Sequence, residues 1–447
     1  MTTTRRNFIK SMAATTAGVA VGGVAKGMSP KSYKKVIGAN DKMQLAIAGL
    51  GRRYGAFIDP IKRKESNVEL RYLCDVMDSS LEKAGERCKK SLGYKSKLEK
   101  DVRKVLEDKD VDAIFIATPD HWHAPGTVMA CQAGKHVYVE KPCSHNMFEN
   151  EILVAAQQKY NKVIQMGNQQ RSSAQSQDII KQIRNGVIGD AYKGLAFYSN
   201  SRPVCPNPKK AAVPTGLDWD LFQGPSPRKE YMHDTWNYNW HWYGWDFGTA
   251  ELGNNATHEL DVARWALGLT YPSKVYVEAA KRNFKEDGWE MYDTMEATFE
   301  FDNGKAIVWD GKSRNAFKTY GAGRGTIIFG TEGTVWMDRG RYELYDRTGK
   351  KIKDSKSASQ EAGTALGGGG DLTTRHAQNF FNAVRGKEEL TSPISEGTIS
   401  QSMVHYGNIA YRIGKGFEVD SKTGRIFDRE AMELWGRTYE PGWEPKI

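Results

Sequence analysis

The sequence predicts an α/β protein in which a doubly wound parallel sheet is followed by an α+β domain with a large, mostly antiparallel, open sheet. Three observations support this prediction. Strand and helix patterns alternate from about residue 42 to residue 167, a glycine-rich turn follows the first predicted strand, and several β-patterned runs occur in the second half of the chain. Alternating strands and helices are the signature of a parallel sheet with helices on both faces.

The composition is that of a globular protein and not of a nucleic-acid-binding one. The chain has 447 residues, enough for two or three domains, of which 39% are hydrophobic and 26% charged. Its formal net charge is +10, but the basic residues form no stripe or recognised module, so no nucleic-acid partner is expected. The five cysteines form no C-x-x-C pair and are odd in number, which argues against a fully paired disulfide framework.

Two arginines near the amino terminus precede a mildly apolar run, a pattern typical of Tat-type export signals. Arg5 and Arg6 are followed by residues 12–25, which are rich in alanine, glycine and valine. This run is too short and too rich in glycine for a membrane span, so none is expected. A disordered basic tail is the alternative. We assign residues 1–39 to a Tat-type signal and linker and expect a periplasmic protein that is exported folded.

The first predicted strand, residues 43–49, runs into a glycine-rich turn. The turn has the pattern G-x-G-x-x-x-G, with glycines at Gly49, Gly51 and Gly55. Glycines tighten such a turn and let the backbone approach a pyrophosphate group at a helix N-terminus. A glycine-rich turn alone is weak evidence, because many are only turns. The next strand, residues 68–75, strengthens the prediction because it ends in Asp75, at the interval expected for ribose recognition. Asp75 would accept hydrogen bonds from a ribose 2′-hydroxyl and repel a 2′-phosphate, which favours NAD over NADP.

The remaining strands and helices of the first domain alternate without interruption. Further strands are expected at residues 111–118, 136–139 and 162–167. The intervening helices are expected at residues 79–91, 101–107, 125–133 and 146–159. The near-continuous apolar run at 111–118 is typical of a parallel strand buried on both faces. We therefore assign residues 40–167 to a nucleotide-binding domain.

A lysine follows the strand at residues 136–139. The strand ends in Glu140, Lys141 and Pro142, which places Lys141 at a carboxyl strand end, where open α/β sheets bind their ligands. A solvated loop lysine is the alternative, but the nucleotide-binding unit upstream favours a functional role. His121 and His123 form an H-x-H pair without the partner residues of a metal site, so no metal is expected and a loop beside the nicotinamide is preferred.

The second half of the chain, residues 168–447, is predicted to form a substrate-binding and oligomerisation domain. A helix is expected at 173–185, and strands are expected at 191–199, 274–279, 293–301, 306–311, 326–330 and 334–337. Residues 231–247 are dense in aromatic side chains, including Trp245, and are interleaved with histidine and asparagine. Two interpretations remain open for this stretch: a buried core, or a rim that stacks on sugar faces.

A predicted helix near residue 258 carries three polar side chains on one face. Asn254, His258 and Asp261 follow one another at i, i+4 and i+7. A lone helix histidine is usually structural. A histidine flanked on its own face by an amide and a carboxylate is a better candidate for an oriented acid or base.

Together these motifs resemble the Gfo/Idh/MocA oxidoreductase family. The stretches that carry the resemblance are the glycine fingerprint, the turn at residues 117–123, the Glu140–Lys141–Pro142 stretch and the Asn254–His258–Asp261 helix. They occur in the family's order and cover nearly the whole chain after the signal. The resemblance implies a Rossmann domain followed by an α/β domain whose open sheet often forms oligomer contacts, so we expect a homodimer or homotetramer.

The resemblance also implies roles for individual residues. Lys141 and His258 would face the nicotinamide and a sugar or polyol, with Asn254 and Asp261 as their catalytic neighbours. The other implied contacts are Thr118, Pro119, His123 and Glu140 for the cofactor, and Arg171 and Trp245 for the substrate. Asn254 departs from the aspartate that many family members carry at this position. Because an amide cannot take a proton, acid–base work would then fall to His258 and Lys141.

Three functions are consistent with these motifs. The preferred one is an oxidoreductase that moves hydride between a hydroxyl carbon of a sugar, polyol or glycoside and a tightly bound NAD. The second is a glycosidase of the same fold, in which oxidation, elimination and re-reduction leave no net redox change. The intact Glu140–Lys141–Pro142 stretch favours the first. The third, an inactive sugar-binding protein, does not fit the presence of both Lys141 and His258.

Overall fold

The computed structural model describes residues 42–355 and 370–447, and the part from Met43 to Ile447 forms one compact unit. The export signal predicted at residues 1–39 lies outside the described residues. None of the helices in the described part of the chain combines the length and apolar character needed to cross a bilayer.

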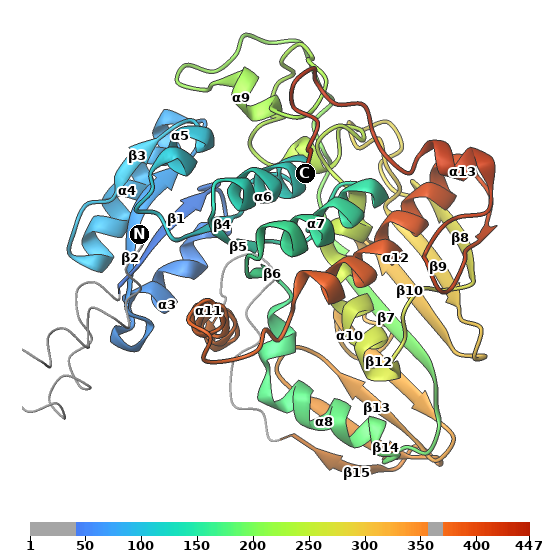
Figure 1. The fold of residues 1–447 in the computed structure, drawn as a ribbon. Helices are drawn as coiled ribbons and strands as arrows, with labels where there is room; N and C mark the ends of the chain where they lie inside the picture. Colours follow the sequence, from blue (N-terminus) through green and yellow to red (C-terminus); the bar gives the residue numbers. More distant parts are fainter. Residues whose placement is uncertain (1–41, 356–369) are drawn as a thin grey trace, which may run out of the picture. The chain divides into compact units, whose positions relative to one another are not determined.

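The first sheet is parallel, as predicted, and has six strands in the order β3-β2-β1-β4-β5-β6 (Figure 1). Its strands are β1 (Met43–Ala48), β2 (Val68–Cys74), β3 (Lys97–Glu99), β4 (Ala113–Ile116), β5 (His136–Val139) and β6 (Ile164–Met166). The short edge strand β3 is the one strand of this sheet that the sequence analysis did not predict. The order reverses between β1 and β4, and such a switch point opens a crevice at the carboxyl ends of the strands.

Helices cover the first sheet, and all but the first of them lie where the sequence analysis expects a helix. They are α3 (Ile58–Lys62), α4 (Asp78–Leu92), α5 (Val102–Glu107), α6 (His123–Gln132) and α7 (Met147–Tyr160). Side-chain caps fix two of their starts. The carboxylate of Asp101 accepts a hydrogen bond from the backbone N–H of Arg103, and Asn146 caps α7 through Glu149 N–H. Each such cap stabilises its helix by about 1 kcal/mol.

One helix of the first domain comes from the far end of the chain. Helix α11 (Gly370–Val384) packs against α3 and contributes Phe380 and Phe381 to the core around Phe115 (Figure 1). The rings of Phe115 and Phe381 stack with their centroids 5.7 Å apart. The core on this face of the nucleotide-binding sheet is therefore built from segments that lie far apart in the sequence.

The second sheet is mostly antiparallel, as predicted, and has ten strands, of which the sequence analysis predicted six. Its order is β15-β14-β13-β12-β7-β10-β9-β8-β16, with β11 beside β7, and only β7 and β10 are parallel neighbours. The strands are β7 (Ala191–Ser201), β8 (Lys274–Ala280), β9 (Thr294–Glu300), β10 (Ala306–Lys312), β11 (Arg314–Asn315), β12 (Arg324–Gly330), β13 (Gly333–Met337), β14 (Tyr342–Asp346), β15 (Lys351–Asp354) and β16 (Phe417–Glu418).

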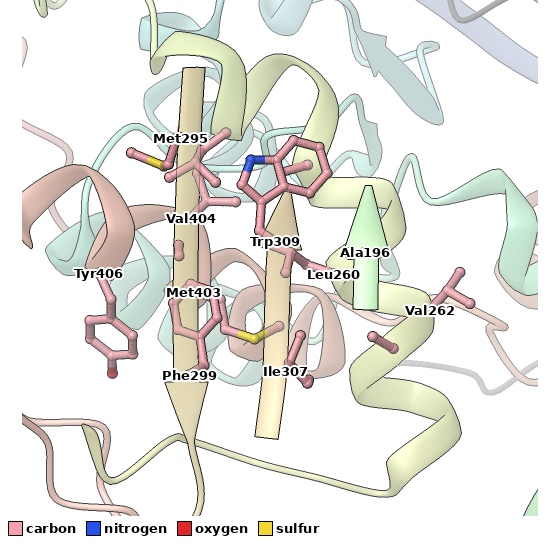
Figure 2. Packing of buried hydrophobic residues seen from close by; sticks show 14 of the residues in the cluster. Ala196, Leu260, Val262, Met295, Phe299, Ile307, Trp309, Met403, Val404 and Tyr406 are labelled. Atoms are coloured by element: carbon pink, nitrogen blue, oxygen red, sulfur yellow. The ribbon is translucent and has the colours of Figure 1, made fainter. Parts of the chain in front are cut away.

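Helices cover one face of this second sheet. They are α8 (Ala174–Arg184), α10 (Thr257–Leu267) and α12 (Ile394–Ile413), and the short helices α9 (Trp219–Gln223) and α13 (Arg429–Glu433) lie in the connections. Leu260 of α10 and Met403 of α12 pack with Phe299 and Trp309 of the sheet (Figure 2). Because α10 and α12 are anchored in this core, any side chain at the start of α10 is held in a fixed place.

Candidate active site

A cavity of about 500 Å³ lies at the carboxyl ends of the first sheet's strands and is closed by residues of the second domain. It brings together most of the residues singled out in the sequence: Gly49, Gly51, Asp75, Thr118, Pro119, His123, Glu140, Lys141 and His258. Gly55, Asn254, Asp261, Arg171 and Trp245 do not line it.

The glycine turn is pressed against the end of β4. Gly49 has a φ of +90°, and a Cβ on it would lie 2.4 Å from the backbone carbonyl of Ala117. Only glycine fits there, for conformational and steric reasons together. At Gly51 a Cβ would meet nothing within 4 Å, so the space in front of this residue is open to a ligand. A short 3-10 turn, Tyr54–Phe57, follows and leads into α3. This cradle fits a pyrophosphate group.

Asp75 ties the same turn to the end of β2. Its carboxylate accepts hydrogen bonds from the backbone N–H of Leu50, at 2.7 Å, and of Met77, at 3.0 Å. Burial raises the pKa of Asp75, while these two hydrogen bonds act in the opposite direction. Each carboxylate oxygen keeps a second lone pair, so Asp75 can still accept from the hydroxyls of a ribose.

Replacing Asp75 with alanine is expected to weaken NAD binding and to relax the discrimination against NADP. The variant loses a charged acceptor, worth about 10- to 100-fold in affinity, and also the repulsion of a 2′-phosphate. Titration calorimetry with both nucleotides measures the ratio of the two affinities. Asp78→Ala is the matched control, because Asp78 is exposed and pairs with Lys100. An unchanged NAD-to-NADP ratio in Asp75→Ala would rule out ribose recognition by this residue.

Lys141 is held at the end of β5 with its amine in the cavity. Its Nζ donates to the backbone carbonyl of Asn254, 2.6 Å away. Burial lowers the pKa of Lys141 to about 8, although the charges of Asp120 and Glu140 act to raise it. The next residue is fixed by a histidine: the ring nitrogens of His123 lie 2.5 Å from Pro142 O and 2.8 Å from Thr118 O. His123 therefore braces the lysine loop against the loop after β4.

His258 reaches the cavity from the second domain. It is the second residue of α10, is 6% exposed, and makes no hydrogen bond to any described residue. Burial lowers the pKa of His258 well below its usual value, and the charges of Arg339 and Lys141 lower it further. The imidazole is therefore neutral near pH 7, with a nitrogen able to take a proton.

Asn254, Asp261 and Arg171 lie in places that do not match their predicted roles. Asn254 belongs to a π-helical turn, Leu252–Ala256, and its side-chain amide donates to Glu251, so only its backbone carbonyl reaches Lys141. Asp261 accepts two hydrogen bonds from Arg171, at 2.7 and 2.8 Å, and a third from Ser400. The predicted orientation of His258 by Asp261 and the predicted substrate contact of Arg171 are corrected accordingly. These buried opposite charges satisfy each other away from the cavity.

The aromatic stretch divides between the two interpretations left open. Trp236, Tyr238 and Trp240 line the cavity, whereas Trp242 stacks on Trp289 in the core with centroids 3.9 Å apart. Trp245, predicted to contact substrate, lines a different cavity of about 670 Å³, where Arg412 lies over its ring. A run of aromatic residues without a regular period gives no indication of which ring faces which side.

Several cavity residues were not predicted. Arg53 pairs with Glu140 at 2.6 Å, and Arg52 lies over the ring of Tyr238 at 4.0 Å. Both arginines stand inside the glycine fingerprint, so their position in the motif could have indicated them. Arg339 lines the cavity from the loop between β13 and β14, and no sequence pattern marks it.

Comparison with known families agrees with this architecture. Residues 43–168 match the model of an oxidoreductase family with an NAD-binding Rossmann fold, and residues 204–444 match that family's C-terminal alpha/beta domain. The chain belongs to the Gfo/Idh/MocA oxidoreductase family. Its first domain is the family's NAD-binding domain, and the glycine cradle and Asp75 are consistent with that cofactor.

Relatives of this Gfo/Idh/MocA chain include oxidoreductases and glycosidases. The uncharacterized oxidoreductase YrbE of Bacillus subtilis is 29% identical over 244 residues, 54% of this chain and 59% of that protein. An alpha-N-acetylgalactosaminidase of Shewanella oneidensis is 24% identical over 254 residues, 54% of this chain and 50% of that protein. The chain thus spans about half the length of these curated relatives.

A solved structure shows the same fold. The WlbA dehydrogenase of Bordetella pertussis, in complex with NADH and UDP-GlcNAcA, is 20% identical with a TM-score of 0.62. The likeness covers 85% of this chain and 99% of that one.

Proposed function

We propose that the protein transfers hydride between a hydroxyl carbon of a sugar, polyol or glycoside and NAD. The observation that carries the proposal is the meeting of Lys141 and His258 in the cavity that also contains the glycine turn. These two groups come from different domains, and Trp240 and Tyr238 lie in the same wall. Aromatic faces beside convergent polar groups are typical of saccharide sites. NAD, when bound, supplies the hydride acceptor.

The two groups divide the proton work in this proposal. The neutral His258 takes the proton of the substrate hydroxyl. The Lys141 ammonium has three donors, of which one serves Asn254 O, and so two remain for the same substrate oxygen. Asp120, buried and bonded to the Thr249 hydroxyl at 2.6 Å, supplies a nearby negative charge that favours the ammonium form. General acid–base help of this kind contributes about 10²- to 10⁴-fold.

A redox-neutral glycosidase is the second candidate. The likeness to an alpha-N-acetylgalactosaminidase, and to a glycosyl hydrolase family 109 protein of Shewanella baltica that is 28% identical over 209 residues, supports it. The intact Glu140–Lys141–Pro142 stretch favours the oxidoreductase instead. In both cases the acid–base pair first acts on a sugar hydroxyl. The glycosidase then also eliminates the aglycone, adds water in its place, and returns the hydride to the product.

We also propose export to the periplasm and assembly as a homodimer or homotetramer. Arg5 and Arg6, followed by the weakly apolar run at 12–25, support the Tat route. Large side chains exposed on strands of the second sheet support self-association: Tyr192, Tyr276 and Ile352. A folded protein sent out of the cytoplasm must carry its nucleotide with it.

The protein purified without added nucleotide is expected to retain roughly one NAD(H) per chain through dialysis, because tight binding is mostly slow release. Mass spectrometry of the released nucleotide measures this. Two assays then separate the candidates: NADH formation on a panel of sugars and polyols, and aryl-glycoside cleavage without added NAD. Ready loss of NAD, with activity that depends on added NAD, contradicts tight binding. Glycoside cleavage with no net NADH supports the second candidate.

A further inference from the structure

One arginine near His258 has no carboxylate partner among the described residues. Arg53 pairs with Glu140 at 2.6 Å. Arg324 holds Glu259 through two hydrogen bonds, Nε to Oε1 at 2.8 Å and Nη2 to Oε2 at 2.9 Å. Both carboxylates are thus engaged. Arg339 stands beside these pairs, lines the cavity, and forms no ion pair with a described residue.

The guanidinium of Arg339 has unsatisfied donors at one edge. Its Nε and Nη2 are buried and have no hydrogen-bond partner among the described residues, and Nη1 of Arg324 is in the same condition. Burial and the charge of Arg324 lower the pKa of Arg339 to about 9. Unpaired buried donors of a charged group are costly, and a specific orphan in a cavity marks the place of an absent partner.

The two free nitrogens have a geometry that selects the partner. Nε and Nη2 form the edge of a guanidinium that binds a planar carboxylate through two parallel hydrogen bonds. Other arginines of the protein use this edge: Arg171 binds Asp261 through Nε and Nη2, and Arg324 binds Glu259 in the same way. Arg339 presents the same edge without its carboxylate.

Arg339 lines the same cavity as His258 and Lys141. Among the charges that lower the pKa of His258, that of Arg339 acts most strongly, ahead of Lys141. Arg339 and the proposed proton acceptor therefore face one cavity, and the charge of one acts on the other. The ribose-binding position at the end of β2 instead has an acid, Asp75, at its edge.

We propose that the substrate is an acidic sugar, whose carboxylate is bound by Nε and Nη2 of Arg339 while a hydroxyl carbon lies at Lys141 and His258. This inference rests on the proposed function, whose substrate class it narrows. Arg339 is then a specificity-determining residue: it pairs with a group that does not react. A neutral sugar would leave its guanidinium buried and unpaired, and sites of that kind discriminate strongly.

Binding by the full chain in the presence of NAD tests this without requiring turnover. Titration calorimetry compares matched probes, D-glucuronate with D-glucose and D-galacturonate with D-galactose. We expect at least one acid to bind about 10- to 100-fold more tightly than its neutral partner. In Arg339→Met this ratio should fall to near unity, and in Arg339→Lys part of it should return. Arg341→Met is the matched control: Arg341 is two residues away, its side chain is 48% exposed, and the ratio should stay as in the wild type.

Other outcomes overturn the proposal. If the wild type binds acidic and neutral sugars with equal affinity, Arg339 does not bind a substrate carboxylate. The same conclusion follows if the preference for acids survives in Arg339→Met. A loss of NAD affinity in Arg339→Met with no change in the ratio assigns Arg339 to the cofactor's phosphates. Absence of NADH formation, with the acid preference intact, counts against the proposed function and leaves the carboxylate site standing.

Discussion

Lys141→Met is expected to reduce kcat/KM by at least about 10²-fold while the variant still folds and binds NAD. The Lys141 amine is the cavity group fixed by Asn254 O at 2.6 Å, and methionine keeps the length of the side chain but removes every donor. The free energy of unfolding should change little or rise, because the lowered pKa of Lys141 shows that its charged form is disfavoured in the folded protein. Steady-state kinetics and thermal unfolding of the two proteins measure both effects.

The chain offers a matched control for this variant at the other end of the same strand. Lys135 precedes β5, is 4% exposed, and donates from Nζ to the backbone carbonyl of Asp108 at 2.7 Å. Lys135→Met removes a buried amine at the other end of the strand from the cavity, so it should alter stability and leave kcat/KM per folded molecule unchanged. Equal activities of the two variants would remove Lys141 from the catalytic group.

The pH profile gives a second measure of the same lysine. If the Lys141 ammonium donates to the reacting oxygen, kcat/KM should be fully developed below pH 8 and fall as the pH rises through about 8, where the amine loses its proton. The residual activity of Lys141→Arg should not show that fall, because a guanidinium keeps its charge. A rise of kcat/KM through the same pH range would assign Lys141 as the base instead.

Gly49→Ala is expected to destabilise the fold by roughly 2–5 kcal/mol, adding the cost of overpacking to that of a left-handed residue with a side chain. The new methyl carbon would lie 2.4 Å from the backbone of Ala117, and backbone at the end of a buried strand cannot move aside cheaply. The free energy of unfolding, measured by urea titration, should fall whether or not NAD is present.

Gly51→Ala separates the fold from the cofactor in the same turn. A Cβ at Gly51 meets no atom within 4 Å, so stability without NAD should stay close to that of the wild type. The methyl group would occupy the space that the cradle leaves for a pyrophosphate, so NAD affinity should fall. Wild-type NAD affinity in Gly51→Ala would place the nucleotide elsewhere, and a stable Gly49→Ala would contradict the contact with Ala117.

The first domain could be predicted closely because its signals are local. An apolar run such as residues 111–118, or a turn such as Gly49–Gly55, specifies its own conformation. That Lys141 and His258 face one cavity could be predicted from the family motifs, although the two residues lie far apart in the sequence. Arg339 could not be predicted, because it draws attention only through its buried donors that lack a hydrogen-bond partner, and a sequence does not show which donors are paired. The role of Asp261 was mistaken because spacing along a helix does not reveal that Arg171 approaches from another element.

Helix α11 completes the nucleotide-binding domain but is synthesised late, after most of the second domain. Phe380 and Phe381 complete the core over Phe115, and Leu372 and Thr373 line the candidate active-site cavity. The ribosome makes all four more than 200 residues after β6 ends at Met166. During synthesis, the face of the first sheet around Phe115 therefore stays uncovered by α11 until most of the second domain has been translated. The complete cavity can therefore form only after translation has passed helix α11, so nucleotide bound in its final form indicates that both domains have been made.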